Sequence, residues 1–137
     1  MIGAVIVTHG RLAGELAEAT ARIVGPTEGI RAVTLGWDDE VSDAREQIQA
    51  AIAEVDTGSG VLVFTDMFGG TPTNVSLAFL ETDRVEIVTG VNLPMLVKLT
   101  SLQQQELPLL EAARQVRDRG QKSIYVATEI LSSQEPS

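Results

Sequence analysis

The stretch GAVIVTHGRLAGEL, residues 3–16, passes from a run of mainly β-branched apolar residues directly into a helical pattern, and the only histidine of the chain, His9, stands at the junction. A short continuous apolar run is typical of a strand that is buried on both faces of a parallel sheet. The segment after it repeats apolar residues with helical spacing, at Leu12, Leu16, Ala19 and Ile23. The stretch therefore predicts a strand over 2–8, a histidine at its carboxyl end, and a helix that stops at Gly25-Pro26.

The same alternation of strand and helix continues along the chain. Further apolar runs predict strands over 30–36, 61–66, 85–90 and 123–131. Helical patterns lie between them: one capped near Ser42, one with Thr71 as N-cap and Pro72 at its first position, one after residue 91, and one over 108–120. Alternation of this kind predicts a single α/β domain over 1–131 with a parallel sheet and helices on both faces, followed by a flexible tail at 132–137.

Composition narrows the class of protein. Apolar residues make up 44% of the 137-residue chain, which is enough to bury a core without disulfides. No apolar run approaches the roughly 20 residues that cross a bilayer, and the N-terminus lacks the features of a secretory signal. Because cysteine is absent, thiolate nucleophiles and cysteine metal sites are excluded. The net charge of −9 disfavours nucleic acid and anionic lipid as partners and favours a basic protein.

Two polar residues follow buried strands at the place where open α/β sheets bind ligands. His9 ends the first predicted strand and Asp66 ends the third. In the common doubly wound strand order 2-1-3-4 these two strands are neighbours, and the crevice at the switch point lies between their carboxyl ends. We therefore expect His9 and Asp66 to face one crevice. A glycine pair, Gly69-Gly70, precedes the next helix, whose N-terminal amides attract anions.

An imidazole, a carboxylate and an anion-binding loop together indicate phosphoryl transfer. An imidazole nitrogen is a nucleophile only while its lone pair is free, so the ring proton must stay on the other nitrogen. Asp66 would hold that proton and stabilise the ring when phosphorylation makes it cationic. The amides of 68–71 would bind the phosphoryl oxygens. This chemistry requires no metal and no cofactor.

Other ligand chemistries fit the sequence less well. A phosphoaspartate receiver needs an acidic pair after the first strand, where this chain has Thr8-His9. A flavin site needs a phosphate loop rich in Ser and Thr there, and HGRLAG is not one. The same segment lacks the G-x-G-x-x-G spacing of a dinucleotide site.

Three motifs, IVTHG at 6–10, VLVFTDMFGGTPTN at 61–74 and VEIVTGVNLPMLVKL at 85–99, resemble the mannose-family EIIA component of the bacterial phosphoenolpyruvate-dependent sugar phosphotransferase system (PTS) in order and spacing. The resemblance covers residues 1–131. It implies that Nε2 of His9 accepts a phosphoryl group from the phosphocarrier HPr as tele-phosphohistidine and that the group passes to an EIIB component. It also implies that Asp66 orients His9 and that Phe68, Gly69, Gly70 and Thr71 surround the phosphoryl group.

The resemblance carries further expectations about assembly. The family fold has a fifth, antiparallel edge strand exchanged within a homodimer, which would be SIYVATEIL at 123–131. Asn92 is expected either to contact the site or only to cap the following helix. We expect a cytoplasmic protein that associates peripherally with a membrane EIIC/EIID complex and does not insert into the bilayer.

Three functions remain open from the sequence alone. The first is a phosphohistidine carrier, which would serve a transporter built from separate chains or a regulatory relay, since no EIIB domain follows. The second is the phosphotransferase subunit of a dihydroxyacetone kinase, although its middle motif generally lacks FGGTP. The third is a non-catalytic regulatory module that histidine phosphorylation switches.

Overall fold

The computed structural model describes residues 1–134. Its four strands are β1 (Gly3–His9), β2 (Ile30–Leu35), β3 (Val61–Thr65) and β4 (Val85–Thr89). Its helices are α1 (Leu12–Val24), α2 (Val41–Val55), α3 (Thr71–Ser76), the 3₁₀ helix η1 (Leu77–Phe79), α4 (Leu93–Leu102), α5 (Leu109–Lys122) and α6 (Ala127–Gln134). Within the described residues no helix combines the length and the apolar character needed to cross a membrane.

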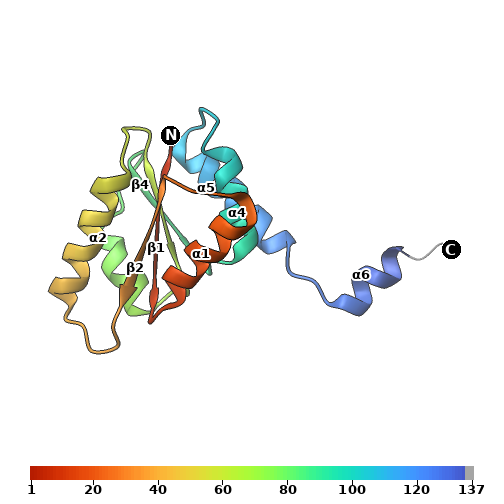
Figure 1. Ribbon diagram of the computed structural model, residues 1–137, viewed down its shortest axis with the longest axis horizontal. Helices are drawn as coiled ribbons and strands as arrows, with labels where there is room; N and C mark the ends of the chain where they lie inside the picture. Colours follow the sequence, from red (N-terminus) through yellow and green to blue (C-terminus); the bar gives the residue numbers. More distant parts are fainter. Residues whose placement is uncertain (135–137) are drawn as a thin grey trace.

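The strands form one parallel sheet in the order β2-β1-β3-β4, so the predicted order 2-1-3-4 is confirmed (Figure 1). The central strand β1 pairs with β2 on one side, where His9 lies opposite Leu35, and with β3 on the other, where Val7 lies opposite Thr65. All four strands therefore end at one side of the sheet, which we call the carboxyl edge. The opposite side, where the strands begin, is the amino edge.

Two apolar cores cover the two faces of the sheet. Along β1, Ala4 and Ile6 belong to one core and Val5 and Val7 to the other, as the alternation of side chains in a strand requires. The first core receives side chains from α1, α4 and α5, and the second from α2 and α3; Figure 1 shows α2 on one side of the sheet and α1, α4 and α5 on the other. Burial on both faces explains why the strands read as continuous apolar runs.

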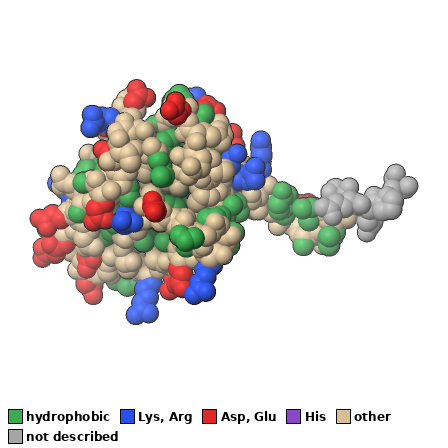
Figure 2. All heavy atoms as spheres, turned by 45° about the horizontal axis from the view of Figure 1, so that its top comes forward, with side chains coloured by type: hydrophobic (Ala, Val, Ile, Leu, Met, Phe, Trp, Pro, Cys, Tyr) green, Lys and Arg blue, Asp and Glu red, His purple; other side chains and the backbone are tan. Residues whose placement is uncertain are grey.

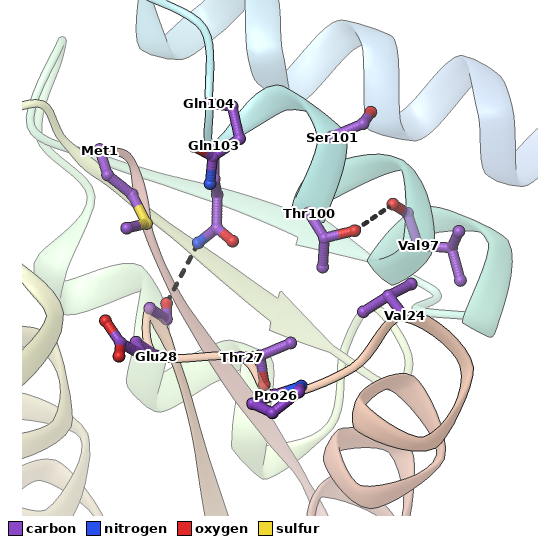
Figure 3. A pocket seen from close by; sticks show the side chains of 11 residues that line it. Met1, Val24, Pro26, Thr27, Glu28, Val97, Thr100, Ser101, Gln103 and Gln104 are labelled. Atoms are coloured by element: carbon purple, nitrogen blue, oxygen red, sulfur yellow. Dashed lines mark hydrogen bonds between the residues drawn. The ribbon is translucent and has the colours of Figure 1, made fainter.

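At the amino edge a buried glutamine joins α4 to the starts of two strands. Nε2 of Gln103 donates to the backbone oxygen of Ile2 at 2.8 Å and to that of Gly29 at 3.3 Å. Beside it opens a cavity of about 540 Å³, lined by Met1, residues 24 and 26–29, and residues of α4 and its end (Figure 3). This cavity lies at the opposite edge of the sheet from His9, and it contains neither of the predicted catalytic residues.

The single chain does not form the predicted strand over 123–131. Residues 124–126 form no regular element, and α6 follows, projecting away from the rest of the chain (Figure 1). A strand needs a neighbour for its backbone groups, and a segment that projects into solvent satisfies them locally instead, as in the bond from the N–H of Glu129 to the oxygen of Val126 at 3.0 Å. Of the predicted tail, 132–134 lie in α6 and 135–137 lie outside the described residues.

Two predicted helix caps lie earlier in the chain, by one residue for α3 and by two for α2. Gly70, in extended conformation, is the N-cap of α3, so Thr71 is the first helical residue and does not cap it; Pro72 lies in the first turn. Helix α2 begins at Val41 after Glu40, and its start has no side-chain cap. In contrast, α1 ends at Val24 with Gly25 at φ +96°, which confirms the predicted glycine stop.

Candidate functional site

The carboxyl edge brings His9 and Asp66 into direct contact. Nδ1 of His9 lies 2.7 Å from Oδ2 of Asp66, and the same oxygen accepts the backbone N–H of His9 at 3.1 Å. The other carboxylate oxygen of Asp66 accepts the backbone N–H of Met67 at 3.1 Å. With Nδ1–H donating to the carboxylate, Nε2 keeps its lone pair. The His9 side chain is 26% exposed, so the ring is half-buried and can still be reached from solvent.

These contacts keep Asp66 ionised. Partial burial by itself would raise the pKa of its carboxyl group, but the hydrogen bonds from the ring and the backbone of His9 outweigh it and lower the pKa below its ordinary value. A carboxylate that remains charged can hold the proton on Nδ1 and can also stabilise positive charge that develops on the imidazole.

The end of β1 is fixed by neighbours on both sides. The buried hydroxyl of Thr8 accepts the N–H of Ala13 at 2.6 Å, which attaches the start of α1 to the strand. Gly10 adopts φ +57° and donates its N–H to the oxygen of Leu35 at 3.0 Å. A glycine is favoured there because side chains rarely adopt this left-handed conformation. The backbone of His9 is therefore held between two anchored residues.

The loop after β3 is anchored by a pair of buried threonines. The hydroxyl oxygens of Thr65 and Thr73 lie 2.7 Å apart, and the Thr73 hydroxyl donates to the backbone oxygen of Met67 at 2.5 Å. These bonds pin the start of α3 to the end of β3. Sequence reasoning does not find them, although a Thr two residues after Thr71 in the same helix turn is a visible candidate.

Gly70 brings this loop against the imidazole. A β-carbon built on Gly70 would lie 2.7 Å from Cε1 and 3.1 Å from Nε2 of His9, so only a glycine leaves room for the ring. Gly69 adopts φ +94°, where glycine is also favoured. Phe68 is 74% exposed and lines a groove along β4, and Thr71 is exposed on the first turn of α3. Of the predicted phosphoryl-binding loop, Gly70 is thus the residue that the structure places against Nε2.

Asn92 serves as a helix cap. Its side-chain oxygen accepts the N–H of Met95 at 3.1 Å, and its amide nitrogen donates to the backbone oxygen of Gly120 at 3.2 Å. Both polar atoms are therefore used to fix α4 against the end of α5. This matches the capping alternative for Asn92.

Sequence reasoning missed Trp37, which stacks on the imidazole of His9. The centroids of the Trp37 and His9 rings are 5.3 Å apart and their planes differ by 22°. Trp37 is the only tryptophan of the chain and lies two residues after β2 at the carboxyl edge. The rule that selected His9 and Asp66, a chemically distinctive side chain just after a strand, would have selected it too.

Comparison with known proteins identifies the family of this chain. Residues 3–116 match the family model described as "PTS system fructose IIA component". The fructose-specific EIIA component of Bacillus subtilis is 30% identical over 132 residues, which cover 96% of this chain and 90% of the relative. The mannose-specific EIIAB component of Escherichia coli K12 is 35% identical over 103 residues, which cover 71% of this chain and 30% of that longer protein.

Solved structures share the architecture. A PTS IIA protein associated with the fucose utilization operon of Streptococcus pneumoniae superposes with a TM-score of 0.81 at 30% identity, covering 94% of this chain and 95% of that one. The phosphotransferase system component EIIA of Streptococcus agalactiae superposes with a TM-score of 0.85, covering 94% and 99%; at 23% identity it shows the fold alone. The sequence match over most of both chains is what decides membership: this chain belongs to the mannose-type EIIA family, the phosphotransferase components of the bacterial sugar phosphotransferase system.

Proposed function

We propose that the protein is a cytoplasmic phosphoryl carrier of the sugar phosphotransferase system, with residues 1–131 as its EIIA domain, and that Nε2 of His9 carries the phosphoryl group between HPr and an EIIB component. The observation that carries this proposal is the 2.7 Å contact between Nδ1 of His9 and Asp66. That contact commits one ring nitrogen to the carboxylate and leaves the other free at the carboxyl edge, beside Gly70.

In the transfer step the Nε2 lone pair forms a bond to phosphorus while the bond between phosphorus and the donor atom breaks, and that electron pair stays with the donor. The ring proton remains on Nδ1, hydrogen-bonded to Asp66, so no proton has to leave the site. The ring gains positive charge, which the adjacent carboxylate stabilises. Transfer to the EIIB component is the same step in reverse with a new acceptor.

The loop 68–71 would contact the transferred group. The first-turn amides of a helix have no partner within the helix, and Thr71 and Thr73 supply such amides in α3. Gly69 and Gly70 carry no side chain that would block approach of the phosphoryl oxygens to the backbone. Oriented amides of this kind stabilise negative charge as it shifts in the transition state.

Labelling with radioactive phosphoenolpyruvate, enzyme I and HPr tests the proposal. The expected product is a labelled protein whose phosphate is lost in acid and kept in alkali, and the substitution His9→Gln abolishes it. Label that survives in His9→Gln contradicts the proposal. Addition of an EIIB component then discharges the label if the protein is a relay; a stable label that only changes the set of bound partner proteins would instead identify a regulatory switch.

We also propose that the protein forms a homodimer by exchange of residues 123–131. The strand β4 pairs only with β3 among the strands of the described residues, and its first residue, Val85, also forms an antiparallel bridge with Glu81. Beyond that bridge no strand of the described residues pairs with its outer side. Along it runs a groove of about 580 Å³ lined by β4 residues, by Phe68 and by the face of α5. The projecting segment carries exposed apolar side chains at Ile124, Tyr125, Val126 and Leu131 (Figure 2). An added antiparallel strand would satisfy the open side of β4 and cover these side chains.

Removal of the residues after Lys122 tests the exchange. The full-length protein should sediment as a dimer and the truncated one as a monomer with a folded core, because α5 and the sheet do not depend on α6. A truncated chain that remains a dimer would place the interface elsewhere.

A further inference from the structure

Trp37 has an unusual environment for the only tryptophan of the chain. Its side chain is 79% exposed, although a large aromatic side chain normally gains stability from burial. One face is nevertheless covered, because the indole stacks on the imidazole of His9 with a centroid distance of 5.3 Å. The indole also lies over Gly10, where an added β-carbon would sit 3.6 Å from the indole nitrogen. The exposed indole therefore contacts the residue that carries the chemistry.

The turn that carries Trp37 is held in place. The N–H of Gly36 donates to the Asp39 carboxylate at 2.7 Å, and the N–H of Asp39 donates to the oxygen of Gly36 at 3.2 Å. These two bonds close the turn directly after β2, which pairs with β1 up to His9. The stack therefore joins the ends of two hydrogen-bonded strands.

The contacts on His9 come from three directions. Asp66 holds the ring at Nδ1, Gly70 approaches at Cε1 and Nε2, and Trp37 covers a face. The hydrogen bond at Nδ1 by itself leaves the ring free to rock about that contact. A parallel aromatic surface limits this rocking and so fixes the direction of the Nε2 lone pair. It also lies where positive charge appears when Nε2 is phosphorylated, and a cation over an indole is stabilised.

We propose that Trp37 is a positioning residue for phosphorylation of His9: the indole fixes the plane of the imidazole and stabilises the ring once Nε2 is phosphorylated. The inference rests on the proposed function, because it assigns Trp37 a part in phosphoryl transfer at His9. A stack on an exposed cation is worth about two- to fivefold in an equilibrium constant, so a modest effect of this size is expected.

Phosphoramidate, a small chemical phosphoryl donor, tests the role without a protein partner. Three variants, Trp37→Leu, Trp37→Phe and His9→Gln, are compared with the wild type for the rate of phosphohistidine formation and for its half-life at neutral pH. Trp37→Leu keeps apolar volume but has no aromatic face, so it should lose about two- to fivefold in one or both quantities. Trp37→Phe keeps a ring and should restore most of the loss. Circular dichroism and thermal midpoints should be unchanged, because the indole is exposed.

The wild-type protein supplies a second readout. Because Trp37 is the one tryptophan of the chain, the tryptophan fluorescence of the protein reports on the surroundings of this indole. Phosphorylation of His9 should change the emission intensity, and phosphoramidate should leave the emission of His9→Gln unchanged.

The outcomes separate the two proposals. The positioning role is overturned if Trp37→Leu reacts with phosphoramidate at the wild-type rate and its phosphohistidine has the wild-type half-life. It is also overturned if the emission of the wild type does not change on phosphorylation. A loss in Trp37→Leu that appears only with phospho-HPr makes Trp37 a docking contact and overturns it as well. A wild-type protein that reacts with phosphoramidate but never with phospho-HPr contradicts the proposed function, while the comparison between the Trp37 variants still decides the role of the indole.

Discussion

The two edges of the sheet each use one polar side chain to join strand ends, and they use it differently. At the carboxyl edge, Asp66 receives a backbone N–H and a ring nitrogen from His9. At the amino edge, Gln103 donates to the backbone oxygens of Ile2 and Gly29. Both residues bridge neighbouring segments. Gln103 is buried, with 7% of its surface exposed, and its Nε2 bonds backbone alone, whereas Asp66 holds a side chain whose second nitrogen stays free.

This difference separates an edge that only joins strands from the edge at which we propose the reaction. A cavity alone does not mark that second edge, because the amino edge has a cavity of about 540 Å³ and no imidazole beside it (Figure 3). The uncommitted ring nitrogen marks it. Substitutions at the carboxyl edge should therefore change the rate of phosphorylation, and substitutions at the amino edge should change stability.

The largest expected effect is that of Asp66→Asn. The amide has no charge to stabilise the cationic ring and does not enforce a proton on Nδ1, so the rate of phosphorylation by phospho-HPr should fall on the order of 10²–10⁴-fold. Rapid-quench labelling measures the rate. The matched control is Asp56→Asn at the amino edge, where the carboxylate accepts only the N–H of Gly58; it should phosphorylate normally. Equal losses in both variants would contradict the division between the edges.

Gly70→Ala is expected to have the next largest effect. The backbone of Gly70 has φ −89° and ψ 172°, which alanine adopts without strain, so the added methyl group acts only through its contact with the His9 ring. Displacement of the ring should slow labelling on the order of 10–10²-fold while the fold stays intact. Gly14→Ala is the control, because nothing lies within 4 Å of that position in α1, and it should label like the wild type.

Gln103→Leu changes the amino edge, and it should lower stability and leave phosphorylation unchanged. The backbone oxygen of Ile2 loses the Gln103 donor, and that of Gly29 loses one donor but keeps the N–H of Ala4 at 2.8 Å. The free energy of unfolding should therefore fall by about 1–3 kcal/mol, as urea titration measures. The phosphorylation rate of the folded protein should not change. A slower rate in Gln103→Leu would show that the amino edge is coupled to His9.

The smallest effect is a pH dependence of stability. The pKa of Asp66 is lowered in the folded state from the ordinary value of 3.8, so the ionised group stabilises the fold above that pH and the contribution is lost as the pH falls through the folded-state pKa. Asp66→Asn has no such group. The difference in unfolding free energy between wild type and Asp66→Asn should therefore be largest near neutral pH and shrink in acid. A difference that grows in acid would mean that Asp66 is not stabilised as a carboxylate.

The sequence was sufficient for the sheet and for the pair at its centre. The strands are buried on both faces, so each appears as an apolar run, and the strand order 2-1-3-4 is the common order of doubly wound folds. Since His9 and Asp66 end adjacent central strands, their contact followed from the order alone. Trp37 lies in the turn after the second strand. Its stacking on His9 could not be predicted, because no local pattern shows which way the side chain of a turn residue points.

Other features depend on partners that no local pattern reveals. Gln103 reaches Ile2 over a separation of 101 residues, and the Thr65–Thr73 pair needs the loop between them to fold back. The β-branched and aromatic residues of SIYVATEIL favour a strand, but strand formation depends on a neighbouring edge that the single chain does not offer this segment. In the single chain the first part of this segment is therefore irregular and Ala127 begins a helix, where residue propensity predicts a strand.

The position of His9 and Asp66 bears on their dynamics. His9 ends β1 and Asp66 follows β3, the two innermost strands, and β1 is hydrogen-bonded on both sides. We expect amide groups in such central strands to exchange with solvent only when the whole domain opens, and those of the projecting helix α6 to exchange faster. The ring that we propose as phosphoryl acceptor is thus tied to the central strands, so we expect a partly unfolded molecule to lose its acceptor geometry and its global stability together.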